Sequence, residues 1–200
     1  MDRLLFYLLI LLINFQNTIC AITNPTPLDY VKTSCKTTLH PALCVNSLST
    51  YANSIQGNGQ LLAKSALTVS LNTAKSAAAF VSKLAGTPNI KPREAQALKD
   101  CVSIMAGCVS SLTQSVQELG KMTQFKGKNF AWHMNSVQTW VSSSLTNQNT
   151  CIGGFSDRSM NGQIKDAVSK KMSSVTQITS NALALVNRFA VSHKEATHKP

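Results

Sequence analysis

The chain has 200 residues and carries 19 lysines and arginines against 8 aspartates and glutamates, which gives a formal net charge of +11. A surface this basic suits an acidic partner, such as a nucleic acid, an anionic membrane or an acidic polysaccharide. So few and scattered acids provide no paired carboxylates for acid–base catalysis, and the length suits one compact domain.

The N-terminus has the pattern of a cleavable export signal. A basic residue precedes the apolar run Leu4–Ile13, and small residues follow it up to Ala21. The run is too short for a membrane span, which needs about 20 residues, and no later stretch is long enough either. We therefore predict a secretory signal peptide at residues 1–21, cleaved after Ala21 or else after Cys20, and a single exported domain at residues 22–200 with no membrane attachment. Export also argues against a nucleic-acid partner, and no basic and aromatic recognition motif is present.

The cysteines indicate disulfide bonds and not a metal site. Removal of Cys20 with the signal leaves an odd number, which implies bridges plus one free thiol in an oxidising compartment. No Cys-x-x-Cys pair or cysteine–histidine cluster has zinc spacing, and there is no phosphate loop, Gly-x-Ser-x-Gly elbow or Ser/His/Asp signature. We therefore predict no metal, no cofactor and no catalytic residue. The remaining cysteines are Cys35, Cys44, Cys101, Cys108 and Cys151.

Residues 28–54 are predicted to form a short helical hairpin. Its two helices, Leu28–Thr37 and Pro41–Ser54, flank a turn that ends in a proline, which the first turn of a helix tolerates. Cys35 and Cys44 lie on either side of this turn, close enough for a disulfide to staple the pair.

Long amphipathic segments fill residues 60–190. In each of the four, apolar residues recur at steps of three and four, the spacing of one helix face, while the other face is polar. Short loops join them, so we predict an all-α fold: an up-and-down antiparallel four-helix bundle preceded by the disulfide-stapled N-terminal helical hairpin. The charged residues 191–200 are expected to form a frayed tail. The segments are expected to end at Gly86, Gly120, Gly153 and about Ala190.

Three ordered motifs resemble a known family. They are VKTSCKTTLHPALC (Val31–Cys44), ALKDCVSIMAGCVSSL (Ala97–Leu112) and VQTWVSSSLTNQNTCIGGF (Val137–Phe155). They resemble, in order, the opening cysteine pair, the motif around the third cysteine and the motif ending at the fourth cysteine of the plant invertase and pectin methylesterase inhibitor family. The chain is most similar to the pectin methylesterase inhibitors of that family.

The resemblance implies an inhibitor protein and not an enzyme. Such inhibitors form a one-to-one complex with a cell-wall pectin methylesterase and cover its substrate cleft with a face of the bundle, in the apoplast. The resemblance also implies the disulfides Cys35–Cys44 and Cys101–Cys151, with Cys108 left as a free thiol inside the bundle. By spacing alone, Cys101 and Cys108 lie on the same helix face and either could meet Cys151; the family motif favours Cys101.

Some positions depart from the family pattern. The family usually has a tyrosine where His40 stands, an acidic residue where Gly153 stands, and acidic and tyrosine residues where Ser103 and Met105 stand. Cys108 replaces the usual alanine. These differences bear on the choice of partner enzyme and on its pH range, and not on the fold.

We expect the partner interface on the outer sides of the second and third bundle helices, at Trp132, His133 and Gln138. Trp132 is the expected anchor, because buried aromatic side chains dominate interface energy. His133 is able to change charge across the mildly acidic range of the cell wall. The alternative is that Trp132 packs inward and His133 merely lies on a wet surface.

Two other functions remain open. An invertase inhibitor of the sister group carries a Pro-Lys-Phe element in the loop between the second and third bundle helices, and here that loop, Met122–Phe130, reads MTQFKGKNF without it. A carrier of apolar ligands or a wall-binding protein would need a cavity, whereas the evenly spaced apolar stripes predict a filled core. The basic residues are dispersed, as on a solvated surface; the alternative is weak electrostatic retention on acidic pectin.

Overall fold

The structure, a computed structural model, describes residues 25–125 and 127–197. The predicted signal peptide at residues 1–21 therefore lies outside the described residues. Within them, the secondary structure consists of α-helices and short 3-10 turns (η), and no strand occurs.

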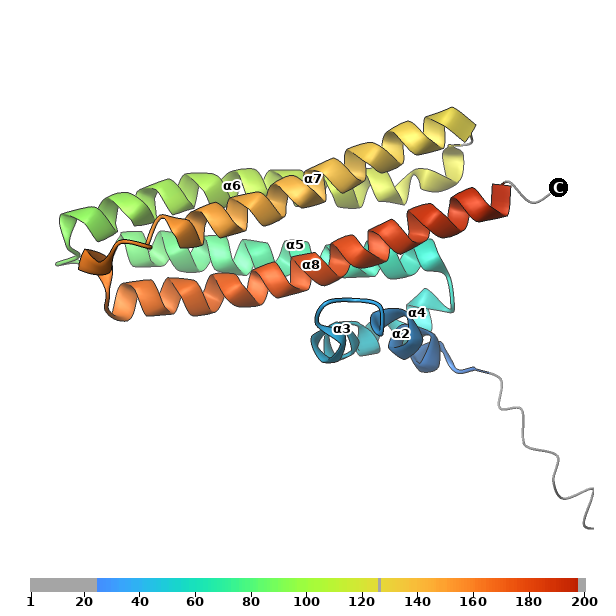
Figure 1. Cartoon of the computed structure of the whole chain (residues 1–200), viewed down its shortest axis with the longest axis horizontal. Coiled ribbons are helices and arrows are strands. Elements are labelled where there is room, and N and C mark those ends of the chain that lie inside the picture. Colours follow the sequence, from blue (N-terminus) through green and yellow to red (C-terminus); the bar gives the residue numbers. More distant parts are fainter. Residues whose placement is uncertain (1–24, 126, 198–200) are drawn as a thin grey trace, which may run out of the picture.

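Four long helices form an up-and-down antiparallel bundle (Figure 1), which confirms the predicted fold class. α5 and α7 each pack against both α6 and α8, so α5 and α7 occupy diagonal corners. Buried apolar side chains at steps of three and four fill the centre. The helices are α5 (Gly59–Ala85), α6 (Pro92–Gly120), α7 (Gly127–Gly153) and α8 (Gln163–Thr197), with η2 (Met122–Gln124) and η3 (Arg158–Met160) in the last two connections.

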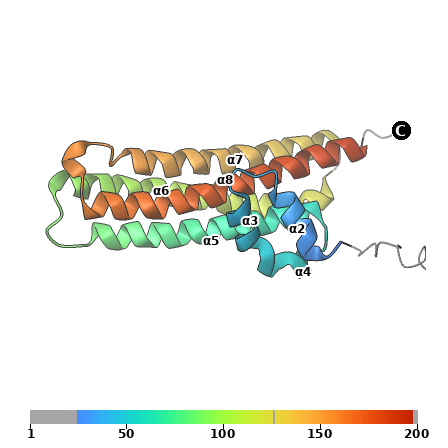
Figure 2. The same cartoon turned by 60° about the horizontal axis from the view of Figure 1, so that its bottom comes forward.

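The N-terminal hairpin lies across α5 and α8 (Figure 2). The structure divides its predicted second helix, 41–54, by a 3-10 turn. The Ser49 hydroxyl there donates to the Asn46 carbonyl oxygen (3.4 Å), and serine and threonine side chains that bond to nearby backbone compete with a regular helix. The elements are α2 (Pro27–Cys35), α3 (Pro41–Leu48), η1 (Ser49–Tyr51) and α4 (Ala52–Ile55).

One asparagine side chain holds the turn of the hairpin to the bundle. Asn181 of α8 is only 4% exposed. Its Oδ1 accepts a hydrogen bond from the His40 backbone N–H (3.0 Å), and its Nδ2 donates to the His40 carbonyl oxygen (2.9 Å). Both bonds go to backbone atoms, so the turn is attached through its main chain while the neighbouring Leu39 stays 78% exposed.

Two disulfides join Cys35 to Cys44 within the hairpin and Cys101 of α6 to Cys151 of α7. Cys108, two turns along α6 from Cys101, is a buried free thiol. These are the pairs that the family motifs imply. By the chain-entropy relation, the short separation of 9 residues contributes roughly 2.5 kcal/mol and the long one of 50 residues about 4 kcal/mol.

A layer of buried polar side chains crosses the bundle, with one residue from each long helix. The Thr179 hydroxyl of α8 donates its hydrogen to the Val175 carbonyl oxygen (2.9 Å). The same oxygen therefore accepts from Ser70 Oγ of α5 (2.8 Å) and from Gln148 Nε2 of α7 (2.9 Å). Gln148 Nε2 also donates to Cys108 Sγ of α6 (3.4 Å). Because sliding any one helix would leave buried polar atoms unpaired, this polar layer fixes the register of the helices.

The last turns of α8 are helical where a frayed tail was expected from residue 191. α8 continues to Thr197, and aromatic contacts with α7 account for the extension. The His193 ring stacks on Phe130 with centroids 3.7 Å apart, and Phe189 meets Phe130 edge to face at 5.9 Å. These rings hold the end of α8 against the start of α7.

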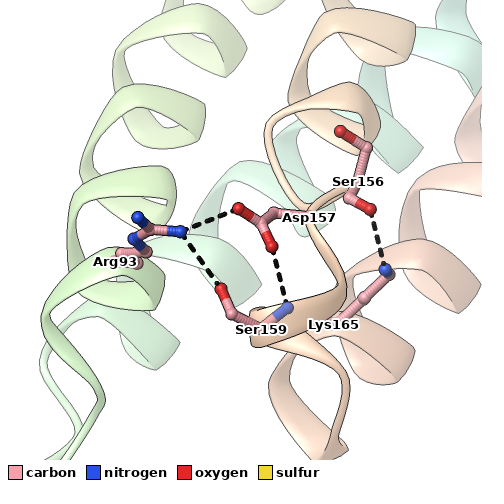
Figure 3. Close-up of polar contacts among 5 residues, drawn as sticks. All are labelled: Arg93, Ser156, Asp157, Ser159 and Lys165. Carbon is pink, nitrogen blue, oxygen red and sulfur yellow. Dashed lines mark hydrogen bonds and ion pairs between the residues drawn. The ribbon is translucent and has the colours of Figure 1, made fainter.

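The loop between α7 and α8 is tied to the start of α6 (Figure 3). Arg93 Nη1 lies 2.8 Å from Asp157 Oδ2 and donates to Ser159 Oγ at 3.4 Å. The other Asp157 oxygen accepts from the Ser159 backbone N–H (2.8 Å), which caps η3. Lys165 of α8 donates to the Ser156 carbonyl oxygen (3.3 Å). The α7–α8 connection is therefore held by Arg93 of α6 and by Lys165 of α8.

Replacing Thr179 with valine tests the polar layer. Thr179→Val keeps the side-chain shape but removes the oxygen to which Ser70 and Gln148 are bonded. We expect the free energy of unfolding, measured by urea denaturation, to fall by about 2–3 kcal/mol. The matched control is Thr176→Val, because Thr176 is half-buried and its hydroxyl bonds the Met172 carbonyl of its own helix; it should change stability by less than about 0.5 kcal/mol. Equal losses in the two variants would contradict the role in register.

Asp157 makes a pH-dependent contribution to stability. The hydrogen bonds from Ser159, and then the charge of Arg93, hold the pKa of Asp157 below its ordinary value of 3.8. Because the folded-state pKa is lowered, the contribution is present above the unfolded-state value and is lost as pH falls through the folded-state value. Asp157→Asn keeps an oxygen for Ser159 but removes the charge that faces Arg93. In thermal unfolding, the wild type should have the higher melting temperature at about pH 6, and the melting temperatures of the two proteins should converge by about pH 2. A difference in melting temperature that stays constant with pH would rule out a contribution from the Asp157 charge.

Candidate partner-binding surface

Trp132 is the most exposed aromatic side chain on the bundle helices. It is 66% exposed, whereas Phe130 and Met134 on the same helix are 3% and 2% exposed. Trp132 follows Phe130 by two residues, which rotates it by about 200° around α7, away from the core. The alternative that Trp132 packs inward is therefore wrong, and the indole is available to a partner.

The His133 ring lies between Glu118 of α6 and the Trp132 indole. Its Nδ1 pairs with Glu118 of α6, and the side chains of the two residues are 21% and 15% exposed. The Phe125 ring stacks on the imidazole with centroids 3.5 Å apart, and Trp132 meets it edge to face at 4.7 Å. Lys121 lies 3.8 Å from the other Glu118 oxygen. His133 is thus part of an ordered cluster at the α6–α7 turn and not a free surface side chain.

Gln138 lies on the other flank of α7. Its Nε2 donates to Asn187 Oδ1 of α8 at 2.8 Å. The structure therefore does not bring the three expected interface residues onto one face: Trp132 points outward, His133 pairs with α6 and Gln138 pairs with α8. Trp132 and His133 remain adjacent, while Gln138 lies at the margin of any surface centred on Trp132.

The outer surfaces of α6 and α7 lack charge over most of their length. From Cys101 to Gln117 and from Met134 to Gly153, the sequence contains no Lys, Arg, His, Asp or Glu. We call the exposed part of these two stretches the neutral surface. It carries the partly exposed Trp140 and many small polar groups, which can donate or accept hydrogen bonds without the cost of desolvating a charge. Its exposed α7 members are Asn135, Thr139, Ser142, Ser143, Thr146, Asn149, Thr150 and Gly153.

Glu118, Lys121 and Phe125 belong to the His133 cluster but were not predicted as site residues from the sequence. A signal for Glu118 was present, because Glu118 and His133 lie at nearly equal distances on either side of the turn at Phe125. Residues placed symmetrically about the turn of an antiparallel helix pair face each other. The stacking of Phe125 on the imidazole has no comparable pattern in the sequence.

Within the described residues, no group of three His, Cys, Asp or Glu side chains could hold a metal ion. Burial raises the pKa of the Cys108 thiol, which keeps it protonated and unreactive. The pocket between the hairpin and the bundle, beside Cys44 and Asn181, has a volume of about 10 Å³, which is room for about one water. No helix in the described part of the chain is both long and apolar enough to span a lipid bilayer.

Comparison with known proteins assigns the chain to a family. The sequence model for the plant invertase/pectin methylesterase inhibitor family matches residues 29–185. The chain belongs to this family. That range includes both disulfides, the polar layer and the neutral surface. Membership of an inhibitor family confirms the expectation that the protein is not an enzyme.

Relatives in the family match nearly the whole chain. Pectinesterase inhibitor 9 from Arabidopsis thaliana is 44% identical over 190 residues, which covers 93% of each chain. Pectinesterase inhibitor 11 from Arabidopsis thaliana is 43% identical over 171 residues, or 85% of each chain. Among solved structures, a mutant form of a pectin methylesterase inhibitor from Arabidopsis has the same fold, with a TM-score of 0.63 at 20% identity over 78% of this chain and 95% of that one.

Tryptophan fluorescence tests the exposure of Trp132. Trp140→Phe leaves Trp132 as the only indole, and Trp132→Phe leaves Trp140, since the chain has two tryptophans. We expect acrylamide to quench the protein that retains Trp132 more strongly, and its emission to lie at longer wavelength, because Trp132 is 66% exposed and Trp140 is partly buried. Stronger quenching of the protein that retains Trp140 would contradict the described orientation of α7.

Proposed function

We propose that the protein is an exported inhibitor of plant pectin methylesterase, which binds the enzyme one-to-one in the cell wall and covers its substrate cleft. The observation that carries the proposal is the match of 93% of the chain to pectinesterase inhibitor 9 at 44% identity. The fold supports it, because the bundle offers preformed helix faces and little ordering entropy is lost when they bind.

The neutral surface together with Trp132 is the part of the molecule that would enter the enzyme cleft. An esterase that acts on a polymer needs an open cleft. The face formed by the adjacent antiparallel helices α6 and α7 is broad enough to cover such a cleft, whereas a single loop is not. Charged residues are depleted at the centres of protein interfaces, and the neutral surface has none. The Cys101–Cys151 disulfide and the polar layer hold α6 and α7 in one arrangement before binding.

Trp132 would act as the anchor, and His133 would orient it. The indole is exposed in the free protein, and a buried aromatic ring is a common centre of binding energy. His133 holds one edge of the indole and pairs with Glu118. Gln138, which pairs with α8, would contribute at the margin.

Titration of the enzyme with the purified protein tests the function. We expect release of methanol from pectin by a plant pectin methylesterase to fall to a plateau at one inhibitor per enzyme, and acid invertase to keep its full activity. Trp132→Ala should weaken inhibition by about thirtyfold, which corresponds to about 2 kcal/mol. Gln138→Ala should weaken it much less, because Gln138 is paired with Asn187 of α8 at the margin of this surface.

Matched controls separate the interface from a general loss of structure. Leu39→Ala also removes an exposed apolar side chain, 78% exposed on the hairpin, and should change inhibition by less than about twofold. Ser143→Arg places a charge on the neutral surface and should weaken inhibition, whereas Ser82→Arg makes the same change on exposed α5 and should not. Unchanged inhibition by well-folded Trp132→Ala and Ser143→Arg would remove this surface from the interface. Inhibition of invertase in place of methylesterase would overturn the choice of partner.

A further inference from the structure

Helix α5 carries positive charge and no negative charge. Between Gly59 and Ala85 the sequence has no Asp or Glu, and its lysines Lys64, Lys75 and Lys83 are all exposed. Among residues 25–125 and 127–197, none of these three ammonium groups takes part in an ion pair. The positive charge of α5 is therefore uncompensated and open to solvent.

The lysines are spread along the helix and do not converge on one point. Lys64 and Lys75 are eleven residues apart, which places them about 16 Å apart along the axis and within about 20° of each other around it. Lys83 lies about 12 Å further along and about 80° round the helix. Lys171 of α8 adds a cation beside them, because its Nζ donates to Ser76 Oγ of α5 (3.0 Å). We call these four lysines the basic face.

The basic face is directed away from the α7 part of the neutral surface, whereas the α6 part adjoins α5, and Lys64 Nζ lies beside Gly120 of α6. α5 and α7 occupy diagonal corners of the bundle, each packed against α6 and α8 (Figure 1). The outward sides of diagonal helices point in opposite directions. A partner centred on α7 would therefore leave the outer side of α5 uncovered.

We infer that the basic face binds a polyuronate, the carboxylate polymer that remains after pectin methyl esters are hydrolysed. The choice of this polymer rests on the proposed function, since each ester hydrolysed with one water yields one carboxylate, one methanol and one proton. Charges spaced by about 12–16 Å along a helix cannot surround a small anion, but an extended polyanion can contact all of them. Charge complementarity thus favours a long acidic chain over a single acidic group.

The surroundings of the lysines argue against a lipid surface. Helices that lie on membranes place large apolar side chains beside their basic residues. On α5 the exposed neighbours are small or polar, including Asn72, Ser76, Ala79 and Ser82, and Leu61 is the one large exposed apolar residue, at the start of the helix. A hydrated polysaccharide needs no such apolar contact.

Retention on immobilised polygalacturonate tests the inference. The variant Lys64→Gln/Lys75→Gln/Lys83→Gln removes three charges from α5. Its matched control, Lys36→Gln/Arg158→Gln/Arg188→Gln, removes three exposed charges from outside α5. At low salt we expect the α5 variant to be retained about tenfold less than wild type and the control less than about threefold less, with the difference lost at high salt because of screening.

Four outcomes would overturn the inference. They are equal losses in the two variants, no retention of the wild type, equal retention on fully methyl-esterified polymer, and equally tight binding to anionic phospholipid vesicles. Inhibition of the esterase is measured separately, on a short uncharged methyl ester, and all three proteins should inhibit equally. If none inhibits but the α5 variant alone loses retention, the proposed function fails and the polyuronate site stands.

Discussion

The register of the four helices depends on hydrogen bonds that are buried at the middle of the bundle. Apolar side chains alone would tolerate a shift of one helix along another, because leucine, valine and alanine present similar surfaces in neighbouring turns. The Thr179 hydroxyl has one hydrogen and fixed partners on two other helices, and Gln148 extends the connection to α6. A shifted helix would leave these atoms unpaired in a dry interior, which is far more costly than imperfect apolar packing.

Correct register is what gives the outer surface its pattern. With α6 and α7 aligned, Glu118 meets His133 at one end and Cys101 meets Cys151 near the other. The uncharged stretches of the two helices, which include Ser103 and Gly153, then form one surface. The lysines of α5 are on the diagonal helix. The fold thus places an uncharged stretch of α7 diagonally opposite a helix that carries only positive charge.

The sequence was sufficient for the helices but not for the directions of side chains between them. Apolar periodicity located all four long helices, and the family motifs implied both disulfides. Neither the break of the hairpin helix at Ser49 nor the extension of α8 past Ala190 was predictable, because each depends on local hydrogen bonds or on a partner ring such as Phe130. Gln138 was expected in the same interface as Trp132, yet it faces α8, since six residues of a helix amount to about 240° of rotation beyond whole turns. The lysines looked dispersed along the chain, and only the diagonal placement of α5 and α7 shows that those of α5 lie away from the uncharged stretch of α7.

Because the hairpin is attached to the bundle through the main chain of His40, the attachment does not require a histidine at that position. Asn181 of α8 hydrogen-bonds the backbone N–H and carbonyl oxygen of His40, and every residue except proline provides both groups. The attachment therefore depends on the backbone conformation of the turn and not on the side chain at position 40. Substitutions of the side chain at the tip of the hairpin should therefore leave the hairpin attached to the bundle, as long as the new residue is not proline.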